Sequence, residues 1–209
     1  MSQNRILTVD FGSQYTHLLA RRIRQLGVKS EIVSPMSSTQ MLSDCKGLIL
    51  SGGPKSVYDK TAIEFNSMVF SLNKPVLGLC YGLQLMAFFL NGKVEKGKTK
   101  EYGKAKIELK KKTGLFSGIM NNSVVWMSHG DKVIEVPKGF DSIASTSDCE
   151  IAGMANEPRQ LYGLQFHPEV THSEQGMKIL ENFIFQICKA EKNWSMKNFL
   201  EKEAKKVRK

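Results

Sequence analysis

A cysteine framed by two glycines is the residue of this sequence best placed to do chemistry. In Gly78-Leu79-Cys80-Tyr81-Gly82 the thiol stands where the apolar, strand-like run PVLGL gives way to a helix-like run. This spacing is typical of a sharp strand-to-helix turn, at which glycines remove Cβ atoms that would clash with the strained backbone. The N-terminus of the following helix favours the thiolate. We therefore predict that Cys80 is a nucleophile rather than a small core residue.

A thiolate nucleophile needs a proton carrier. The sequence has four histidines: His17, His129, His167 and His172. His167 follows the strand-like segment YGLQF, and the proline after it favours extended backbone. Because side chains two apart in an extended segment project to the same side, Glu169 can reach and orient the His167 ring. The sequence predicts a Cys80–His167–Glu169 triad, and the other three histidines are expected to have structural or surface roles.

Acyl transfer also needs donors for the oxyanion that forms on the attacked carbonyl group. The backbone N–H of Tyr81, directly after the nucleophile, is one expected donor. The other is Gly53 in the loop SGGP, since only glycine lets the backbone approach so closely. The loop has neither a P-loop ending nor a dinucleotide-binding glycine spacing, so it is not predicted to bind phosphate.

The segments around these residues predict an α/β fold: a mostly parallel central sheet with helices on both faces and an antiparallel extension at one edge. Apolar strand-like runs alternate with helical segments in the first half, including helices over Tyr15–Leu26 and Ala62–Leu72. Short strands between polar turns follow in residues 93–164: AKIEL, SVVWM and KVIEV. A last core helix is expected over Glu174–Ala190. In such sheets the active site lies at the carboxyl ends of the strands.

Composition and charge narrow the classes of function. The 209 residues include 30 basic and 20 acidic side chains, for a net charge of +10. The basic runs over 93–112 and 188–209 do not interleave aromatic residues as base-stacking surfaces do, so we expect a solvated face or a surface for an acidic partner, not nucleic acid. The four cysteines lack metal-ligand spacing, and no metal site is predicted. No apolar segment suits a membrane span or a signal peptide, so we expect a cytoplasmic protein with reduced thiols.

Two units are expected along the chain. Residues 1–190 form the catalytic domain, and residues 191–209 form a basic helical tail. Ser195 can cap the tail helix, with Trp194 and Phe199 at the spacing of a hydrophobic staple. The tail carries few apolar residues, so we expect it to begin a linker to a further domain.

With this triad and the loop SGGP, the chain resembles the class I, or triad, glutamine amidotransferases over nearly all of Arg5–Ala190. The strings DFGSQY, WMSHGDKV, MANE and FHPEVTHSEQG are similar to the glutaminase domains of GMP synthetases within that family. The resemblance implies that Cys80 attacks the side-chain amide of glutamine and that His167 protonates the departing ammonia. The γ-glutamyl thioester is then hydrolysed to glutamate. It also implies four substrate-binding residues: Gln84, Ser128, Gly130 and Asp131.

The resemblance implies a partner as well. In these enzymes ammonia passes to an ATP pyrophosphatase, or synthetase, domain or subunit, where ATP adenylates xanthosine monophosphate (XMP) and ammonia displaces AMP to give GMP. The chain has no SGGVDS nucleotide-binding loop. ATP and Mg²⁺ are therefore expected only in that partner, and no cofactor in this chain. The tail resembles the lead-in to the synthetase domain of two-domain forms, which favours an excised domain.

Alternatives stay open on the residues alone. Another class I amidotransferase or a γ-glutamyl hydrolase would share the cysteine turn and the His-Pro-Glu segment, although DFGSQY and WMSHGDKV argue against the hydrolase. A papain-type peptidase is disfavoured by the sequence around Cys80 and by the close spacing of His167 and Glu169. A non-catalytic nucleic-acid-binding protein would use the +10 charge and bind in a salt-sensitive way without Cys80.

Overall fold

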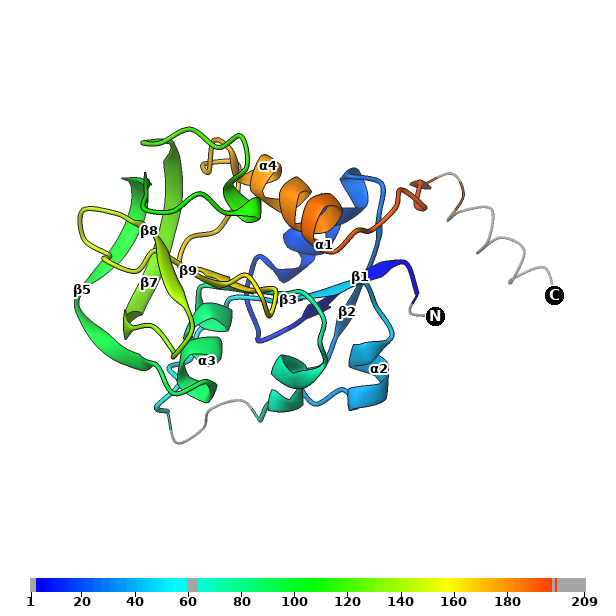
Figure 1. Cartoon of the computed structure of the whole chain (residues 1–209), viewed down its shortest axis with the longest axis horizontal. Coiled ribbons are helices and arrows are strands. Elements are labelled where there is room, and N and C mark those ends of the chain that lie inside the picture. The colour runs from blue at the N-terminus through cyan, green and yellow to red at the C-terminus, as the bar shows by residue number, and fades with distance from the viewer. Residues whose placement is uncertain (1–2, 60–63, 197, 199–209) are drawn as a thin grey trace.

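The central element of the fold is an eight-stranded sheet in the order β2-β1-β3-β4-β10-β9-β8-β6 (Figure 1). The computed structural model describes residues 3–59, 64–196 and 198. The parallel strands are β1 (Arg5–Val9), β2 (Lys29–Val33), β3 (Gly47–Leu50), β4 (Val76–Leu79) and β10 (Leu161–Leu164). The antiparallel strands are β9 (Gly153–Asn156), β8 (Asp141–Ser145) and β6 (Glu108–Leu109). The predicted fold class is confirmed.

Helices cover both faces of this sheet, because its central strands are apolar on both sides. Figure 1 shows α1 and α4 above the sheet and α2 and α3 below it. The upper layer consists of α1 (Thr16–Gln25), α4 (Gly176–Glu181) and the π-helix η3 (Asn182–Ile187). The lower layer consists of α2 (Thr39–Ser43), the 3₁₀ helix η1 (Ser67–Ser71) and α3 (Tyr81–Phe89). A hydrophobic core lies on each face of the sheet, and alternate residues of β1 belong to different cores. Ile6 packs with the upper helices and Leu7 with the lower ones.

A second, two-stranded antiparallel sheet lies beside the main sheet. It pairs β5 (Lys93–Lys106) with β7 (Val124–Glu135). The expected short strands SVVWM and KVIEV are parts of the single strand β7, and AKIEL spans the passage from β5 to β6. The pairing is irregular: Lys96 lies opposite Asp131 and Glu101 opposite His129, so residues 97–100 of β5 face only Gly130. These strands therefore form a ribbon beside the main sheet and do not extend its edge.

Two predicted helices are shorter than expected. In place of a helix over Ala62–Leu72, the structure has η1, and residues 62 and 63 lie outside the described part. The helix predicted over Glu174–Ala190 begins at Gly176, since the side chains of the two residues before it bond to the ribbon and its connecting loop. It ends at Ile187, and Lys189 has a φ of 52°, which no helix continues. A short 3₁₀ turn, η2 (Gly114–Phe116), precedes β7.

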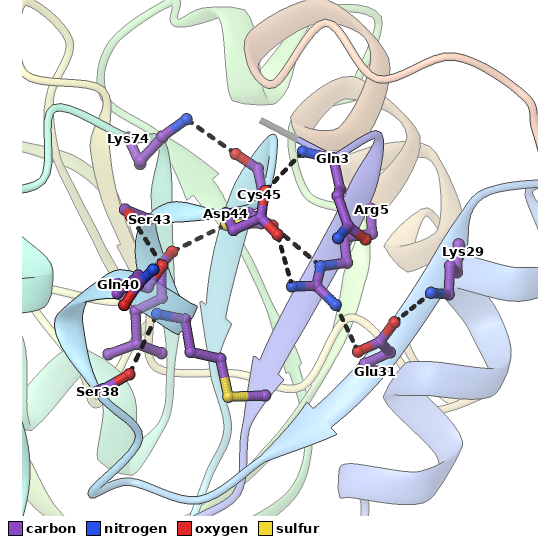
Figure 2. A network of polar contacts seen from close by, with 12 residues as sticks. Gln3, Arg5, Lys29, Glu31, Ser38, Gln40, Ser43, Asp44, Cys45 and Lys74 are labelled. Carbon is purple, nitrogen blue, oxygen red and sulfur yellow. Dashed lines mark hydrogen bonds and ion pairs between the residues drawn. The ribbon is translucent and has the colours of Figure 1, made fainter. Parts of the chain in front are cut away.

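The amino ends of the strands are joined by a polar network around Arg5 (Figure 2). The half of its guanidinium nearest β2 donates to Glu31 at 2.7 Å. The other half donates to the backbone and side chain of Asp44 at 2.9 and 3.2 Å. Lys74 donates to the carbonyl of Cys45 at 3.0 Å. The network connects β1, β2 and the loop before β3. It lies at the amino ends of the parallel strands, on the side of the sheet opposite their carboxyl ends.

The start of the predicted tail is attached to this same end of the molecule. The backbone N–H groups of Asn193 and Trp194 donate to the carbonyl of Gly27 at 2.9 Å. Asn198 N–H donates to the hydroxyl of Ser195 at 3.2 Å, as expected of a capping residue. The rest of the predicted tail helix lies outside the described residues, and the division into a domain and a tail stays a prediction.

Candidate active site

Cys80 occupies a strained turn between β4 and α3. Its φ of 51° and ψ of −105° are a conformation that residues with a Cβ atom rarely adopt. Its N–H donates to Leu164 at the end of β10 at 2.7 Å, and its carbonyl accepts from Gln84 at 3.1 Å. The predicted sharp strand-to-helix turn is therefore present, and bonds to the neighbouring strand and the following helix hold it in place.

The two flanking glycines allow α3 to start close against the sheet. A Cβ atom on Gly78 would lie 2.5 Å from the carbonyl oxygen of Gly82. A Cβ atom on Gly82 would lie 2.4 Å from the carbonyl oxygen of Leu50, in β3. Both distances are far inside van der Waals contact, and the atoms in the way are backbone. The glycines thus set the depth at which the turn sits on the sheet.

Substituting Gly82 should destabilise the protein even though alanine favours helix. We expect Gly82→Ala to lower the free energy of unfolding by about 3 kcal/mol, because backbone must move to admit the methyl group. Thermal unfolding should show the midpoint falling by roughly 6–12 °C. The matched control is Gly114→Ala, whose new Cβ would meet its nearest atom at 3.9 Å; it should change stability by less than about 0.5 kcal/mol. Equal midpoints for the two variants would contradict this account of the turn.

The structure brings the three predicted triad residues together. Because β4 and β10 are paired in parallel, with Leu79 opposite Leu164, Cys80 and the segment after β10 leave the sheet side by side. The side chains of Cys80 and His167 line the same pocket, close enough for Cys80 to help raise the pKa of the imidazole. On its other side, His167 Nδ1 lies 2.8 Å from Glu169 Oε1. The Cys80 thiol also lies 3.5 Å from the carbonyl of Ser128, so it is held between the imidazole and β7.

His167 is buried and fixed from several sides. Only 3% of the residue is exposed. Its backbone N–H donates to the backbone carbonyl of Trp126 in β7 at 3.0 Å. Its backbone carbonyl accepts from the Ser173 hydroxyl at 2.6 Å. The edge of the Tyr15 ring packs against the imidazole with 5.0 Å between ring centroids. The ring therefore has one orientation, in which its two nitrogens face the thiol and the carboxylate.

Electrostatics around His167 favour its protonated form. Burial opposes the charged ring, but the negative charge of Glu169, its hydrogen bond to the ring and the nearby Cys80 outweigh it and raise the pKa of His167 well above its ordinary value. Glu169 is only 2% exposed and has little water to compete for its charge. The arrangement supplies an imidazolium that can hold a proton at neutral pH and release it to a leaving group.

A pocket of about 480 Å³ opens over the Cys80 thiol and the His167 ring. Most of the other predicted site residues line it: Gly53, Gln84, Ser128, Gly130 and Asp131. Tyr81 does not line it; its ring packs into the lower core, 5.6 Å from Phe11. Tyr81 can therefore act as an oxyanion donor only through its backbone N–H. This group lies in the first turn of α3, where N–H groups have no partner within the helix. A Cβ atom on Gly53 would lie 2.8 Å from the carbonyl oxygen of Phe11, which explains the glycine in this loop.

Gln84 has a partner of its own inside the pocket wall. It is 3% exposed, and its side-chain amide donates to the backbone carbonyl of Asp131 at 2.8 Å. One N–H of the amide is engaged, so Gln84 can hold Asp131 in place while its oxygen and its second N–H have no hydrogen-bond partner in the described part of the chain. Its position in the wall is as predicted; its engagement with Asp131 was not foreseen.

Sequence reasoning missed part of the pocket lining. Residues from the first loop and from β5 complete it, among them Ser13, Tyr15, Lys96, Gly97 and Tyr102. The only signal for the first loop was the string DFGSQY, which carried a resemblance but no assigned roles. The lysine-rich run of β5 gave no signal for a pocket. Of the other histidines, His17 is exposed on α1, His172 is exposed and stacks on Trp126 with 4.5 Å between ring centroids, and His129 is buried.

No group of three His, Cys, Asp or Glu side chains within residues 3–59, 64–196 and 198 could hold a metal ion. Among the helices of those same residues, none is both long and apolar enough to cross a membrane. All four cysteines are free thiols. The reactive groups that the structure brings together at the site are the Cys80 thiol, the His167 imidazole and the Glu169 carboxylate.

Comparison with known proteins identifies the family. Residues 7–187 match the family model described as glutamine amidotransferase class-I. The chain belongs to this family. The predicted resemblance is thereby confirmed, and the Cys80–His167–Glu169 arrangement lies inside the matched range of this amidotransferase.

Relatives of this amidotransferase are named for GMP synthesis. It is 45% identical over 207 residues to "GMP synthase [glutamine-hydrolyzing]" of Brachyspira hyodysenteriae and 48% identical over 205 residues to that of Bacillus subtilis. These matches cover 98% and 97% of this chain and 40% of each relative. The chain thus spans about two fifths of the length of the curated relatives it matches.

Solved structures agree on the fold. A Thermoplasma acidophilum protein described as a GMP synthase subunit superposes with a TM-score of 0.78 at 34% identity, over 88% of this chain and 93% of that one. A glutamine amidotransferase from Thermotoga maritima superposes with a TM-score of 0.73 at 18% identity, over 88% and 97% of the two chains. The second likeness shows the fold alone.

Proposed function

We propose that this chain is the glutaminase part of a GMP synthase. It hydrolyses glutamine to glutamate and ammonia and supplies the ammonia to a synthetase unit that aminates XMP to GMP. The observation that carries the proposal is the buried Cys80–His167–Glu169 triad at the base of a pocket. The identity of 45–48% to glutamine-hydrolysing GMP synthases supports XMP as the ammonia acceptor, rather than the acceptors used by other amidotransferases.

The geometry supports a two-step acyl transfer. The Cys80 sulfur attacks the side-chain carbonyl carbon of glutamine as a thiolate, with its proton already held on the His167 imidazolium. The N–H groups of Gly53 and Tyr81 stabilise the oxyanion, and His167 returns the proton to the nitrogen as the C–N bond breaks and ammonia leaves. A water molecule, deprotonated by His167, then attacks the γ-glutamyl thioester. Glutamate departs, which restores the Cys80 thiolate and the His167 imidazolium.

Glu169 acts throughout by orienting the imidazole and by stabilising its positive charge. Ser128, Gly130 and Asp131 bind the amino-acid end of glutamine along β7. Gln84 contributes through its free oxygen and through its hold on Asp131. These roles are those that the family resemblance implies, and they are supported by the presence of Gln84, Ser128, Gly130 and Asp131 in the pocket lining with Cys80.

The acceptor chemistry belongs to a partner. We place ATP, Mg²⁺ and XMP in a synthetase domain or subunit, and we assign no cofactor to this chain. The chain's match to only two fifths of its relatives' length is consistent with that division. The exposed lysines Lys96, Lys104 and Lys106 of β5, of which Lys96 lines the pocket, offer a basic surface toward the partner. We place the reaction in the cytoplasm, where thiols stay reduced.

The test is production of glutamate and ammonia from glutamine, with and without a GMP synthase synthetase domain, ATP and XMP. We expect hydrolysis by the chain alone, faster hydrolysis with the complete mixture, and GMP formation from glutamine only in that mixture. Absence of glutamate in every mixture would contradict the proposal. Hydrolysis of γ-glutamyl peptides in preference to free glutamine would favour a γ-glutamyl hydrolase.

A further inference from the structure

His129, which the proposed reaction does not use, is held between two hydrogen-bond acceptors in the pocket wall. Its Nδ1 lies 3.0 Å from the backbone carbonyl oxygen of Asp131, and its Nε2 lies 3.1 Å from Glu101 Oε2. The residue is 5% exposed, and the Glu101 side chain is 13% exposed. A neutral imidazole has one N–H and can donate to only one of these oxygens. Both bonds form together only when the Glu101–His129 pair carries one additional proton.

The contacts of this pair meet at one carbonyl group in the pocket wall. The Asp131 carbonyl accepts from His129 and also from the Gln84 side chain at 2.8 Å. Gln84 is one helical turn after the nucleophile, and its N–H is bonded to the Cys80 carbonyl. A chain of contacts therefore runs from Glu101 on β5 through β7 to the start of α3.

The pair also lies where the ribbon is least regular. Glu101 is the first residue of β5 to resume pairing after residues 97–100, which face only Gly130 on the other strand. The pocket wall contains residues on both sides of this irregularity: Lys96, Gly97, Tyr102 and 128–131. The register shift interrupts the regular ladder at this point, so the Glu101–His129 hydrogen bond adds a side-chain contact that helps to fix β5 against β7 there.

We propose that Glu101 is a positioning residue for glutamine: through His129 it holds Asp131 and the neighbouring 128–131 segment in the arrangement that binds the substrate. The inference rests on the proposed glutaminase function and deepens it. His129 is not a second catalytic base, because both of its ring nitrogens face protein oxygens. Without Glu101 the ring loses its hydrogen bond to β5, and only its bond with the Asp131 carbonyl would still orient it.

The charges around the pair give the expected pH dependence. Burial lowers the pKa of His129 below its ordinary value, with Lys132 of β7 acting in the same direction and Glu101 and the Asp131 carbonyl opposing. The nearby Cys149 thiol stays neutral, since burial raises its pKa to about 12. As pH rises, the pair loses its additional proton, and one of the two ties to the ring is lost. Glutamine should therefore bind more weakly at higher pH.

The test measures glutamine binding by calorimetry in a Cys80→Ala background, so that no hydrolysis intervenes. We expect Glu101→Ala to raise the dissociation constant about tenfold or more. Glu101→Gln should bind within about threefold of the parent, because its amide can donate to Nε2 while Nδ1–H donates to Asp131. The matched control is Glu95→Ala, a change of an exposed glutamate on the same strand that lies outside the pocket lining.

Two further readouts separate positioning from simple stability. With Cys80 intact, Glu101→Ala should raise KM for glutamine and change kcat by less than about threefold. From about pH 5 to about pH 7 the dissociation constant should rise with Glu101 present, because the pKa of His129 lies below its ordinary value, and it should stay level in Glu101→Gln. Unchanged binding in Glu101→Ala, with glutamine still hydrolysed by the wild-type chain, would overturn the inference alone. So would equal losses in the Ala and Gln variants. Failure of the wild-type chain to hydrolyse glutamine, together with failure of the Cys80→Ala chain to bind it, would overturn the proposed function and this inference together.

Discussion

Replacement of Cys80 by alanine should lower the rate of glutamine hydrolysis by about 10⁴-fold or more, because the covalent route is lost outright. The remaining pocket can still bind glutamine but has no atom to form the thioester. The fold should be unaffected, since alanine is smaller than cysteine and the turn is held by backbone bonds to Leu164 and Gln84. Glutamate release by the wild-type chain and the variant measures the effect.

The matched control for this prediction is Cys45→Ala. Cys45 is buried at the opposite edge of the sheet (Figure 2), and burial raises the pKa of its thiol to about 11, so it is not a nucleophile at neutral pH. We expect this variant to keep hydrolysis within about threefold of wild type. Loss of activity in the Cys45 variant with retention in the Cys80 variant would reject the assigned nucleophile.

Changes to the other two triad members should be nearly as severe, with a distinct signature in pH. His167→Asn removes the proton carrier and should cost about 10³-fold in kcat. Glu169→Gln keeps an acceptor for Nδ1–H but removes the negative charge, and should cost about 10²-fold. Because Glu169 helps to raise the pKa of His167, its loss should lower that pKa. The imidazolium then disappears at lower pH, and the alkaline limb of the kcat profile moves toward acid.

The measurement is kcat as a function of pH for wild type, Glu169→Gln and His167→Asn. An alkaline limb that stays in place in Glu169→Gln would show that the carboxylate does not control the proton on His167. Full activity of His167→Asn would remove the imidazole from the mechanism. Thermal unfolding of each variant separates these outcomes from loss of the fold.

The sequence predicted those parts of the fold that depend on local pattern. Apolar runs such as GLIL and VLGL, buried on both faces, indicated parallel strands, and the structure has them as β3 and β4. The ribbon was not predicted, because β5 is rich in lysine and its partner β7 is joined to it by nonlocal pairing with an irregular register. The helix over Ala62–Leu72 was wrong in extent: in the described residues it is only η1, in which Asn66 accepts from the N–H of Met68.

The candidate site divides in the same way. The closeness of His167 and Glu169 follows from a spacing of two in extended backbone, and it is observed at 2.8 Å. The approach of Cys80 to His167 depends on β4 and β10 being neighbours, which no local pattern states; it was inferred from the need of a thiolate nucleophile for a proton carrier. The Glu101–His129 tie spans the irregular ribbon and had no signal in the sequence.

The central claim is that Cys80 is the nucleophile for glutamine, and covalent trapping tests it most directly. The chain is incubated with an electrophilic glutamine analogue, and the site of modification is located by mass spectrometry of peptides. The account predicts one adduct, on Cys80, which forms more slowly when glutamine is present and is absent from Cys80→Ala. An adduct on Cys45, Cys149 or Cys188, or no adduct from a chain that hydrolyses glutamine, would contradict it.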